Sequence, residues 1–104
     1  MTTLDKNKIA RALEKQLKDN FMKNIQVEVL VADVIQATAI HEDSTEVAIV
    51  VFINDDYNVD VTLYAIRYTN RVELIKHYST KSEDNLASII LSNAITSATL
   101  VETM

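Results

Sequence analysis

The first pattern along the chain is an apolar residue at every fourth position of a charged segment. The positions that repeat in this way are Ile9, Leu13, Leu17 and Phe21. A spacing of four places these side chains on one face of a helix. Thr3 or Asp5 can cap the amino end of this helix, and Asn24 stands where its carboxyl end is expected. The pattern therefore predicts an N-terminal amphipathic helix.

After Asn24 the apolar positions alternate with polar ones, which is typical of β-strands. Four strands are expected, over residues 25–32, 46–53, 59–66 and 72–78. The first of them can continue toward Ile40 with a bulge near Asp33, and residues 33–40 fit either a strand or a helix. The links between strands are short enough for hairpins, so the simplest arrangement is an antiparallel meander.

The 46–53 segment is apolar on both of its faces. One face carries Val47, Ile49, Val51 and Ile53, and the other carries Ala48, Val50 and Phe52. A strand of this kind is covered on both sides. Either one helix covers each face of the sheet, or both helices share one face and a second copy of the chain covers the other. We therefore expect a homodimer.

The last apolar segment, from Leu86 to Val101, predicts a C-terminal helix. Its inward positions are expected to be Leu86, Ile89, Ile90, Ala94 and Ala98. Thr80 and Glu83 have the spacing of a capping box, which predicts a start near Lys81 or Ser82. The segment contains six Ser, Thr and Asn residues and is too short and polar to span a bilayer. The expected fold class is α+β, in the order α-β-β-β-β-α, as a single domain over residues 1–104.

Composition changes the picture because Gly, Pro, Cys and Trp are all absent. The turns must use residues that tolerate left-handed backbone, and Asn and Asp are expected in that role. Seven stand at predicted turns: Asn24, Asp43, Asn54, Asp55, Asp56, Asn58 and Asn70. Phosphate-binding loops that depend on Gly are excluded. The absence of Cys excludes disulfides and thiolate metal sites, and with no targeting segment it favours a cytoplasmic setting.

Two predicted turns carry acidic side chains of the kind that a metal-dependent enzyme uses. The 41–43 turn has one His and two carboxylates, and the 55–60 segment has three carboxylates. Alternating hairpins place these turns at opposite ends of the sheet, so they cannot form one site. Calcium loops also need a Gly, and an exposed hairpin tip does not shift a carboxyl pKa. We interpret both as solvated turns and predict no catalytic residue, metal or cofactor.

Charge is unevenly distributed along the chain. Residues 1–24 hold six basic and three acidic side chains, a net charge of +3, and the remainder holds four basic and twelve acidic ones, a net charge of −8. The cationic face of the first helix consists of Lys8, Arg11, Lys15 and Lys18. Such a face fits an acidic partner or ordinary solvation. The acidic total disfavours nucleic acid as a partner.

A second candidate surface combines tyrosine and arginine at the end of the 59–66 strand. Its members are Tyr64, Arg67, Tyr68 and Arg71. Tyr and Arg are enriched at the centres of protein interfaces, so this group has the composition of a binding patch. The alternative interpretation is a covered sheet face whose tyrosine hydroxyl groups reach water.

These observations predict a non-enzymatic protein–protein interaction module that acts through surface contacts as a homodimer. A small acidic adaptor, chaperone or inhibitor fits this description, including an accessory protein of a phage or mobile element. One alternative is a small-ligand or nucleotide-binding protein with a pocket at the sheet–helix or dimer seam. Another is a metal-dependent enzyme that uses the acidic turns.

Overall fold

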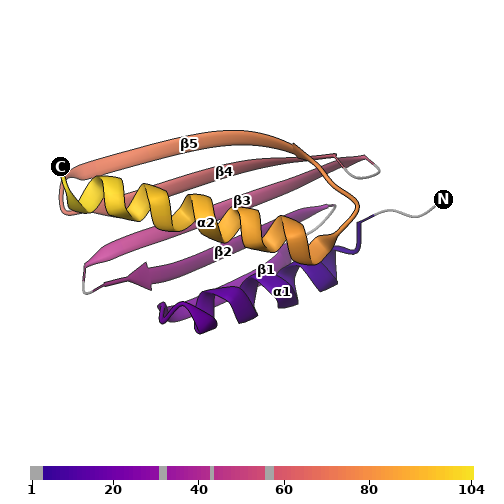
Figure 1. Cartoon of the computed structure of the whole chain (residues 1–104), viewed down its shortest axis with the longest axis horizontal. Helices are drawn as coiled ribbons and strands as arrows, with labels where there is room; N and C mark the ends of the chain where they lie inside the picture. Colours follow the sequence, from indigo (N-terminus) through magenta and orange to yellow (C-terminus); the bar gives the residue numbers. More distant parts are fainter. Residues whose placement is uncertain (1–3, 31–32, 43, 56–57) are drawn as a thin grey trace.

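The computed structural model describes residues 4–30, 33–42, 44–55 and 58–104. The elements are α1 (Lys6–Asp19), β1 (Lys23–Leu30), β2 (Val34–His41), β3 (Thr45–Asp55), β4 (Asn58–Arg67), β5 (Asn70–Ser79) and α2 (Glu83–Glu102). The strands form one antiparallel sheet in the order β1-β2-β3-β4-β5 (Figure 1). The prediction of an α+β fold with a meander between two helices is confirmed.

The number of strands in the prediction was wrong, because the sheet has five strands and not four. The predicted first strand (25–32) does not continue to Ile40 through a bulge, since β1 ends at Leu30 and pairs antiparallel with β2. The inward residues have odd numbers on both sides of this turn, as with Val29 and Ile35. Inward residues therefore have odd numbers in both strands, as they would in one continuous strand. No Gly indicates that the chain turns between them.

Helix α1 begins where the sequence predicts and ends earlier. The Asp5 carboxylate accepts hydrogen bonds from the backbone N–H groups of Asn7 at 2.9 Å and Lys8 at 3.3 Å. At the other end, Asn20 is the cap, and the Met22 N–H donates to the Leu17 carbonyl at 3.1 Å. This is a Schellman motif.

The shorter helix leaves Phe21 outside the apolar stripe to which the sequence assigned it. The side chain of Phe21 is 89% exposed, whereas the neighbouring Met22 is buried. Met22 therefore supplies the last apolar contact of this end of α1, and the expectation for Phe21 was wrong. Asn24 is also no helix cap, since it lies within β1.

Helix α2 is capped by Ser82, whose hydroxyl accepts the Asn85 N–H at 3.2 Å. The predicted capping box does not form: Thr80 accepts the Ser82 N–H, and the Glu83 carboxylate accepts the Asp5 N–H at 2.9 Å. Glu83 thus joins the first turns of the two helices. The buried positions confirm the predicted inward face except at Ile89, which is partly exposed.

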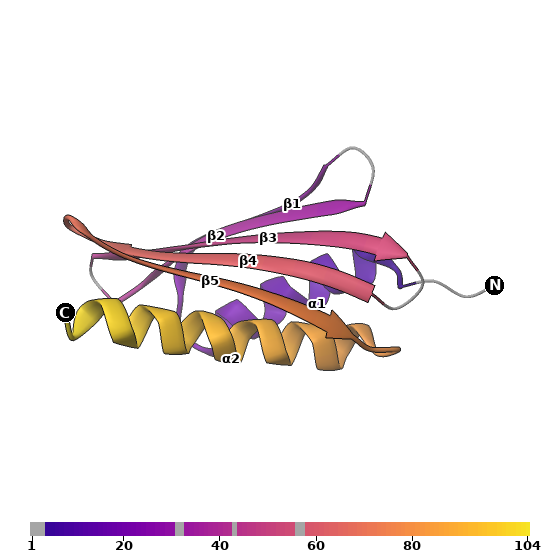
Figure 2. The same cartoon turned by 90° about the horizontal axis from the view of Figure 1, so that it is seen from above.

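Both helices cover the same face of the sheet, as Figure 2 shows from above. α1 packs on β1 and β2, α2 packs on β3, β4 and β5, and the helices contact each other. Gln16 and Ser88 form one of these contacts, with a hydrogen bond of 2.9 Å between their side chains. The core lies in this single layer between sheet and helices. The largest fully buried residues are Ile9, Leu13, Leu17, Ile35, Val47, Ile49, Val51, Val59, Val61, Leu63, Leu86 and Ile90.

Candidate functional site

The face of the sheet opposite the helices has no covering layer among the described residues, and we call it the open face. It consists of alternate residues from five strands. They are Gln26, Glu28, Leu30, Val34, Gln36, Thr38, Ile40, Glu46, Ala48, Val50, Phe52, Asp60, Thr62, Tyr64, Ile66, Arg71, Glu73, Ile75 and His77. Helices cover only the other side in Figure 2. The second apolar face predicted for β3 therefore exists and has no covering layer in one copy.

Large apolar side chains are exposed on the open face. Leu30 of β1 is 38% exposed, Phe52 of β3 is 44% exposed, and Ile75 of β5 is 67% exposed. Ala48 and Val50 lie between them on β3 and are half-buried. Scattered apolar residues are normal on a surface, but a contiguous apolar region rimmed by polar groups is characteristic of an interaction site.

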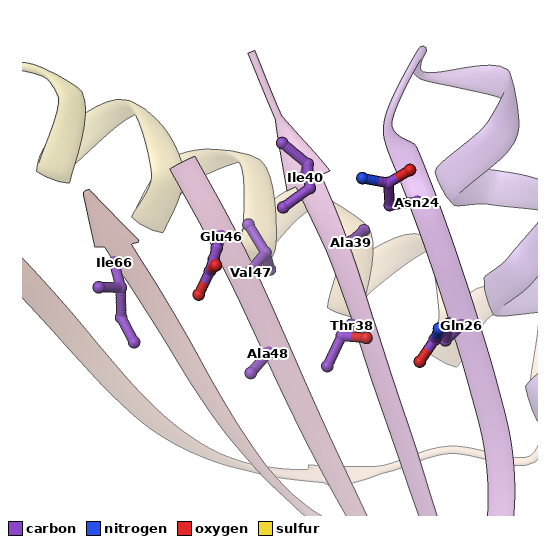
Figure 3. A pocket seen from close by; sticks show the side chains of 9 residues that line it. All are labelled: Asn24, Gln26, Thr38, Ala39, Ile40, Glu46, Val47, Ala48 and Ile66. Atoms are coloured by element: carbon purple, nitrogen blue, oxygen red, sulfur yellow. The ribbon is translucent and has the colours of Figure 1, made fainter. Parts of the chain in front are cut away.

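A hollow of about 320 Å³ lies at one end of the open face (Figure 3). Thr38 and Ala48 line it with short side chains at the lower centre of this view, while Ile40 stands above them and Ile66 to their left. The hollow exists because short side chains in neighbouring strands are surrounded by longer ones. No single segment of the sequence contains this arrangement, so it could not be predicted from the sequence.

Polar groups rim the same hollow. Asn24, Gln26 and Glu46 line it with amide and carboxylate groups. Glu46 is exposed, and its side chain makes no hydrogen bond or ion pair with any residue that the structure describes. The rim therefore presents an unneutralised carboxylate beside an apolar floor, which suits a group that is both apolar and cationic.

The remaining charges of the open face are largely paired. Arg71 Nη2 lies 3.1 Å from Glu73 Oε2. His77 Nδ1 lies 2.7 Å from Asp60 Oδ1, and the Asn54 amide donates to Asp60 Oδ2 at 2.7 Å. These hydrogen bonds, first that of His77 and then that of Asn54, lower the pKa of Asp60. Asp60 thus remains a carboxylate and acts in the surface hydrogen-bond network.

The predicted tyrosine–arginine patch is present as two separate pairs. The Arg71 guanidinium lies 4.4 Å from the centre of the Tyr64 ring, and both side chains are on the open face. The Arg67 guanidinium lies 5.5 Å from the Tyr68 ring, but Arg67 reaches the helix layer and donates to the Glu102 carbonyl at 3.5 Å. Only Tyr64 and Arg71 therefore belong to the candidate surface.

The predicted cationic face of α1 is exposed and points away from the sheet. Its members Lys8, Arg11, Lys15 and Lys18 are all exposed. Lys18 pairs with Glu14 at 3.1 Å within the helix, and Lys8 lies 3.8 Å from Glu83. These exposed pairs contribute little stability. The face stays a candidate surface for an acidic partner.

The acidic turns provide no assembled metal site in the part of the chain that the structure describes. His41 Nδ1 lies 2.6 Å from Glu102 Oε1, so His41 and Glu102 join the end of β2 to the last turn of α2. Asp43 and Asp56, which are predicted to lie in the two acidic turns, are outside the described residues. Among the described residues, no group of three His, Asp or Glu side chains is placed to hold a metal ion.

Comparison with known proteins adds no family to this description. The chain matches no protein-family model, no curated protein and no solved structure. No helix within the described ranges is long and apolar enough to cross a membrane. The class that the fold defines is a two-layer α+β protein with one open sheet face.

Proposed function

We propose that this chain is a non-enzymatic protein–protein interaction module that acts through the open face of its sheet and forms a homodimer. The observation that carries the proposal is the position of both helices on one face, which leaves β3 uncovered on the other. Apolar side chains on that face gain free energy when a second layer removes them from water. A second sheet packed face to face supplies such a layer.

The size of the open face supports the second copy as the partner. Five strands of eight to eleven residues, at about 3.3 Å per residue and spaced about 4.8 Å apart, cover roughly 750 Å². A stable interface buries about 800 Å² on each partner. The face is therefore large enough for a dimer without a contribution from the helices.

Lys76 favours packing on the face over strand addition at the β5 edge. It lies between Leu74 and Tyr78 on the helix-facing side of β5, where its ammonium group stays exposed. A charged residue that points inward from an edge strand prevents another strand from pairing there. On the open face, the register of the described residues places a lysine at the irregular start of β1, where Lys23 pairs with Ile40, and none on the central strands.

The test is the mass of the protein in solution, measured by sedimentation velocity from 1 to 100 µM, with Val50→Glu as the variant. Val50 is central on the open face and half-buried. We expect a dimer for the natural chain and a monomer for Val50→Glu, because each copy would bury an unpaired carboxylate. Lys15→Glu on α1 is the control and should remain dimeric. A natural chain that is monomeric at 100 µM contradicts the proposal.

The hollow supports a second candidate function, the binding of a small molecule. Its volume of about 320 Å³ is at the lower end of the range for ligand pockets. A ligand held there lies at the expected dimer seam. A library of small organic cations screened by thermal shift tests this candidate, because a ligand that binds the folded state raises the melting temperature. The effect should disappear in Thr38→Trp, which fills the hollow.

A further inference from the structure

The two edges of the sheet differ in the side chains that point toward the helix layer. At the β5 edge, one of these positions is occupied by the charged residue Lys76, which stays exposed. At the β1 edge, the corresponding residues are Ile25, Val27 and Val29, which are apolar and half-buried. An inward charge prevents the addition of another strand, and an apolar edge permits it. The β1 edge therefore lacks the protection that Lys76 gives to the β5 edge.

The backbone of β1 is regular along most of this edge. Its register with β2 shifts between Lys23 and Gln26 and then continues without a break from Gln26 to Leu30. At about 3.3 Å per residue, this regular part is roughly 17 Å long. Among the described strands β1 pairs only with β2, so every second residue directs its backbone N–H and C=O groups away from the sheet. An extended chain can bind such groups as a sixth strand.

Helix α1 lies over β1 at this edge of the sheet (Figure 1). Its residue Gln16 faces α2, where the side chain bonds to Ser88. Glu14 and Lys18 each stand two residues from Gln16, which places them on nearly the opposite side of the helix, facing past β1. The methylene groups of such side chains cover apolar neighbours while the charges stay in water. Helix α1 therefore offers a cover for the inward side chains of a sixth strand.

A second copy of the chain does not fit at this edge. Antiparallel pairing of β1 with itself places the two strands about 4.8 Å apart and both α1 helices on the same side of the joined sheet. Packed helices need about 8 to 10 Å between their axes. Because each α1 lies over its own β1, the two helices would overlap. The fitting partner is a segment that has no helix of its own over the strand that it adds.

The other side of β1, which belongs to the open face, determines the charge of the partner. Glu28 is exposed there, and its cross-strand neighbour on β2 is the neutral Gln36. The Glu28 side chain makes no hydrogen bond or ion pair with any described residue. A basic side chain directly opposite Glu28 stabilises a strand pair, and an acidic one destabilises it. The net charge of −5 also attracts a basic segment.

We propose that the β1 edge binds an extended segment of another protein, which adds to residues 26–30 as a sixth strand. The segment alternates apolar residues, which point toward α1, with polar ones, and it places Lys or Arg opposite Glu28. This site goes beyond the homodimer proposed above, because a second copy packed on the open face leaves the edges of the sheet uncovered. Both sites can therefore be occupied at the same time.

The first experiment titrates the natural chain with two synthetic seven-residue peptides and follows its backbone amide resonances by NMR. In both peptides valine alternates with polar residues, and the central polar residue is lysine in one and glutamate in the other. We expect the lysine peptide to bind at least threefold more tightly, and Glu28→Lys should reverse this order. Glu73→Lys is the matched control, because it makes the same charge change on β5, and it should leave the order unchanged.

A variant at Val27 tests the edge itself. Val27→Lys gives β1 the inward charge that Lys76 gives to β5, and it should weaken the binding of the lysine peptide at least tenfold. Val27→Thr keeps a β-branched side chain without a charge, so it is the control and should retain most of the affinity. Equal binding of the lysine peptide to Val27→Lys and to the natural chain would show that the edge is not the site.

Amide hydrogen exchange locates the bound lysine peptide. Exchange should slow at every second residue of 26–30 and stay unchanged in β5. Protection on the open face instead of β1 overturns the proposal, and so does the absence of binding by both peptides at 1 mM. Protection of β1 that rises with protein concentration and needs no peptide would show that a second copy occupies the edge. Val50→Glu should bind the lysine peptide as the natural chain does, so the edge site and the homodimer can fail separately.

Discussion

At the residue scale, the chain forms its turns without glycine by placing larger residues in left-handed backbone. The described residues with positive φ are Phe21 at 62°, Asn24 at 53°, Glu42 at 58° and Tyr68 at 57°. Only Asn24 is among the residues that the composition predicted for this role. All four lie at the same end of the sheet, where α1 enters β1 and where two hairpins turn. Chain reversal therefore imposes these conformations against the local preference of the residues.

Phe21 provides a direct test of this strain. Replacement of Phe21 by Gly should raise the free energy of unfolding by about 0.5 to 1 kcal/mol, because Gly adopts positive φ without a Cβ clash while adding some entropy to the unfolded chain. Phe21→Ala is the matched control and should give no gain, since it removes the exposed ring and keeps Cβ. Urea unfolding measures both variants. A loss of stability in Phe21→Gly would show that the ring contributes to the fold.

Glu83 is the residue whose ionisation should stabilise the contact between the two helices. The hydrogen bond from the Asp5 backbone N–H, then that from its own backbone N–H, lowers the pKa of Glu83. Because the folded pKa is below the unfolded value of about 4.3, the stabilisation is present at neutral pH and is lost as pH falls through the folded pKa.

Glu83→Gln should therefore reduce the free energy of unfolding by about 1 to 2 kcal/mol at pH 7, the size of a hydrogen bond to a charged group. The difference from the natural chain should shrink below about pH 4. Asp84→Asn is the control, because Asp84 shares the first turn of α2 and is exposed. Urea unfolding across pH 3 to 7 measures the free energy of unfolding of the natural chain and of both variants. If Glu83→Gln and Asp84→Asn lose the same stability at pH 7, the effect comes from the helix dipole.

At the scale of elements, the alternation of apolar residues was sufficient to predict the strands β3, β4 and β5. It failed at the β1–β2 hairpin, because inward residues keep odd numbers through the turn and no Gly or Pro marks it. Tyr64 and Arg71 were predictable as neighbours because one short turn joins their strands. Thr38 and Glu46 were not, since the hollow depends on the pairing of β2 with β3 and β4.

The edge strand β5 should depend on Lys76 to remain unpaired. Replacement of Lys76 by Val would complete an apolar stripe with Leu74 and Tyr78 along an exposed edge. We expect Lys76→Val to form oligomers larger than the dimer, because the free backbone groups of the edge are then available to other chains. Light scattering during incubation at 37 °C measures this. Lys15→Val, which removes the same charge from α1, is the control and should not aggregate. If Lys76→Val and Lys15→Val aggregate equally, the loss of a positive charge lowers solubility and the β5 edge has no special role.

At the scale of the whole molecule, one layer of core must stabilise a sheet that has two faces. The chain carries a net charge of −5, with the cationic side chains of α1 on the helix layer. Two copies joined through their open faces place both helix layers outside, so the cationic faces of the two α1 helices stay available to an acidic partner. The proposed dimer therefore uses the apolar surface of the molecule for association and its basic surface for further contacts.

Self-association of this kind makes thermal stability depend on protein concentration. Each tenfold rise in concentration should raise the melting temperature of the natural chain by roughly 3 to 5 °C, since dimer formation adds about 1.4 kcal/mol per dimer, shared by two chains of about 100 residues. Val50→Glu, which separates the open faces, should melt at a lower temperature that does not change with concentration. Differential scanning calorimetry from 10 to 500 µM measures both slopes. If the melting temperature of the natural chain does not change with concentration over this range, the single core layer is sufficient to stabilise the folded monomer. The open face then stays in water until a different protein covers it.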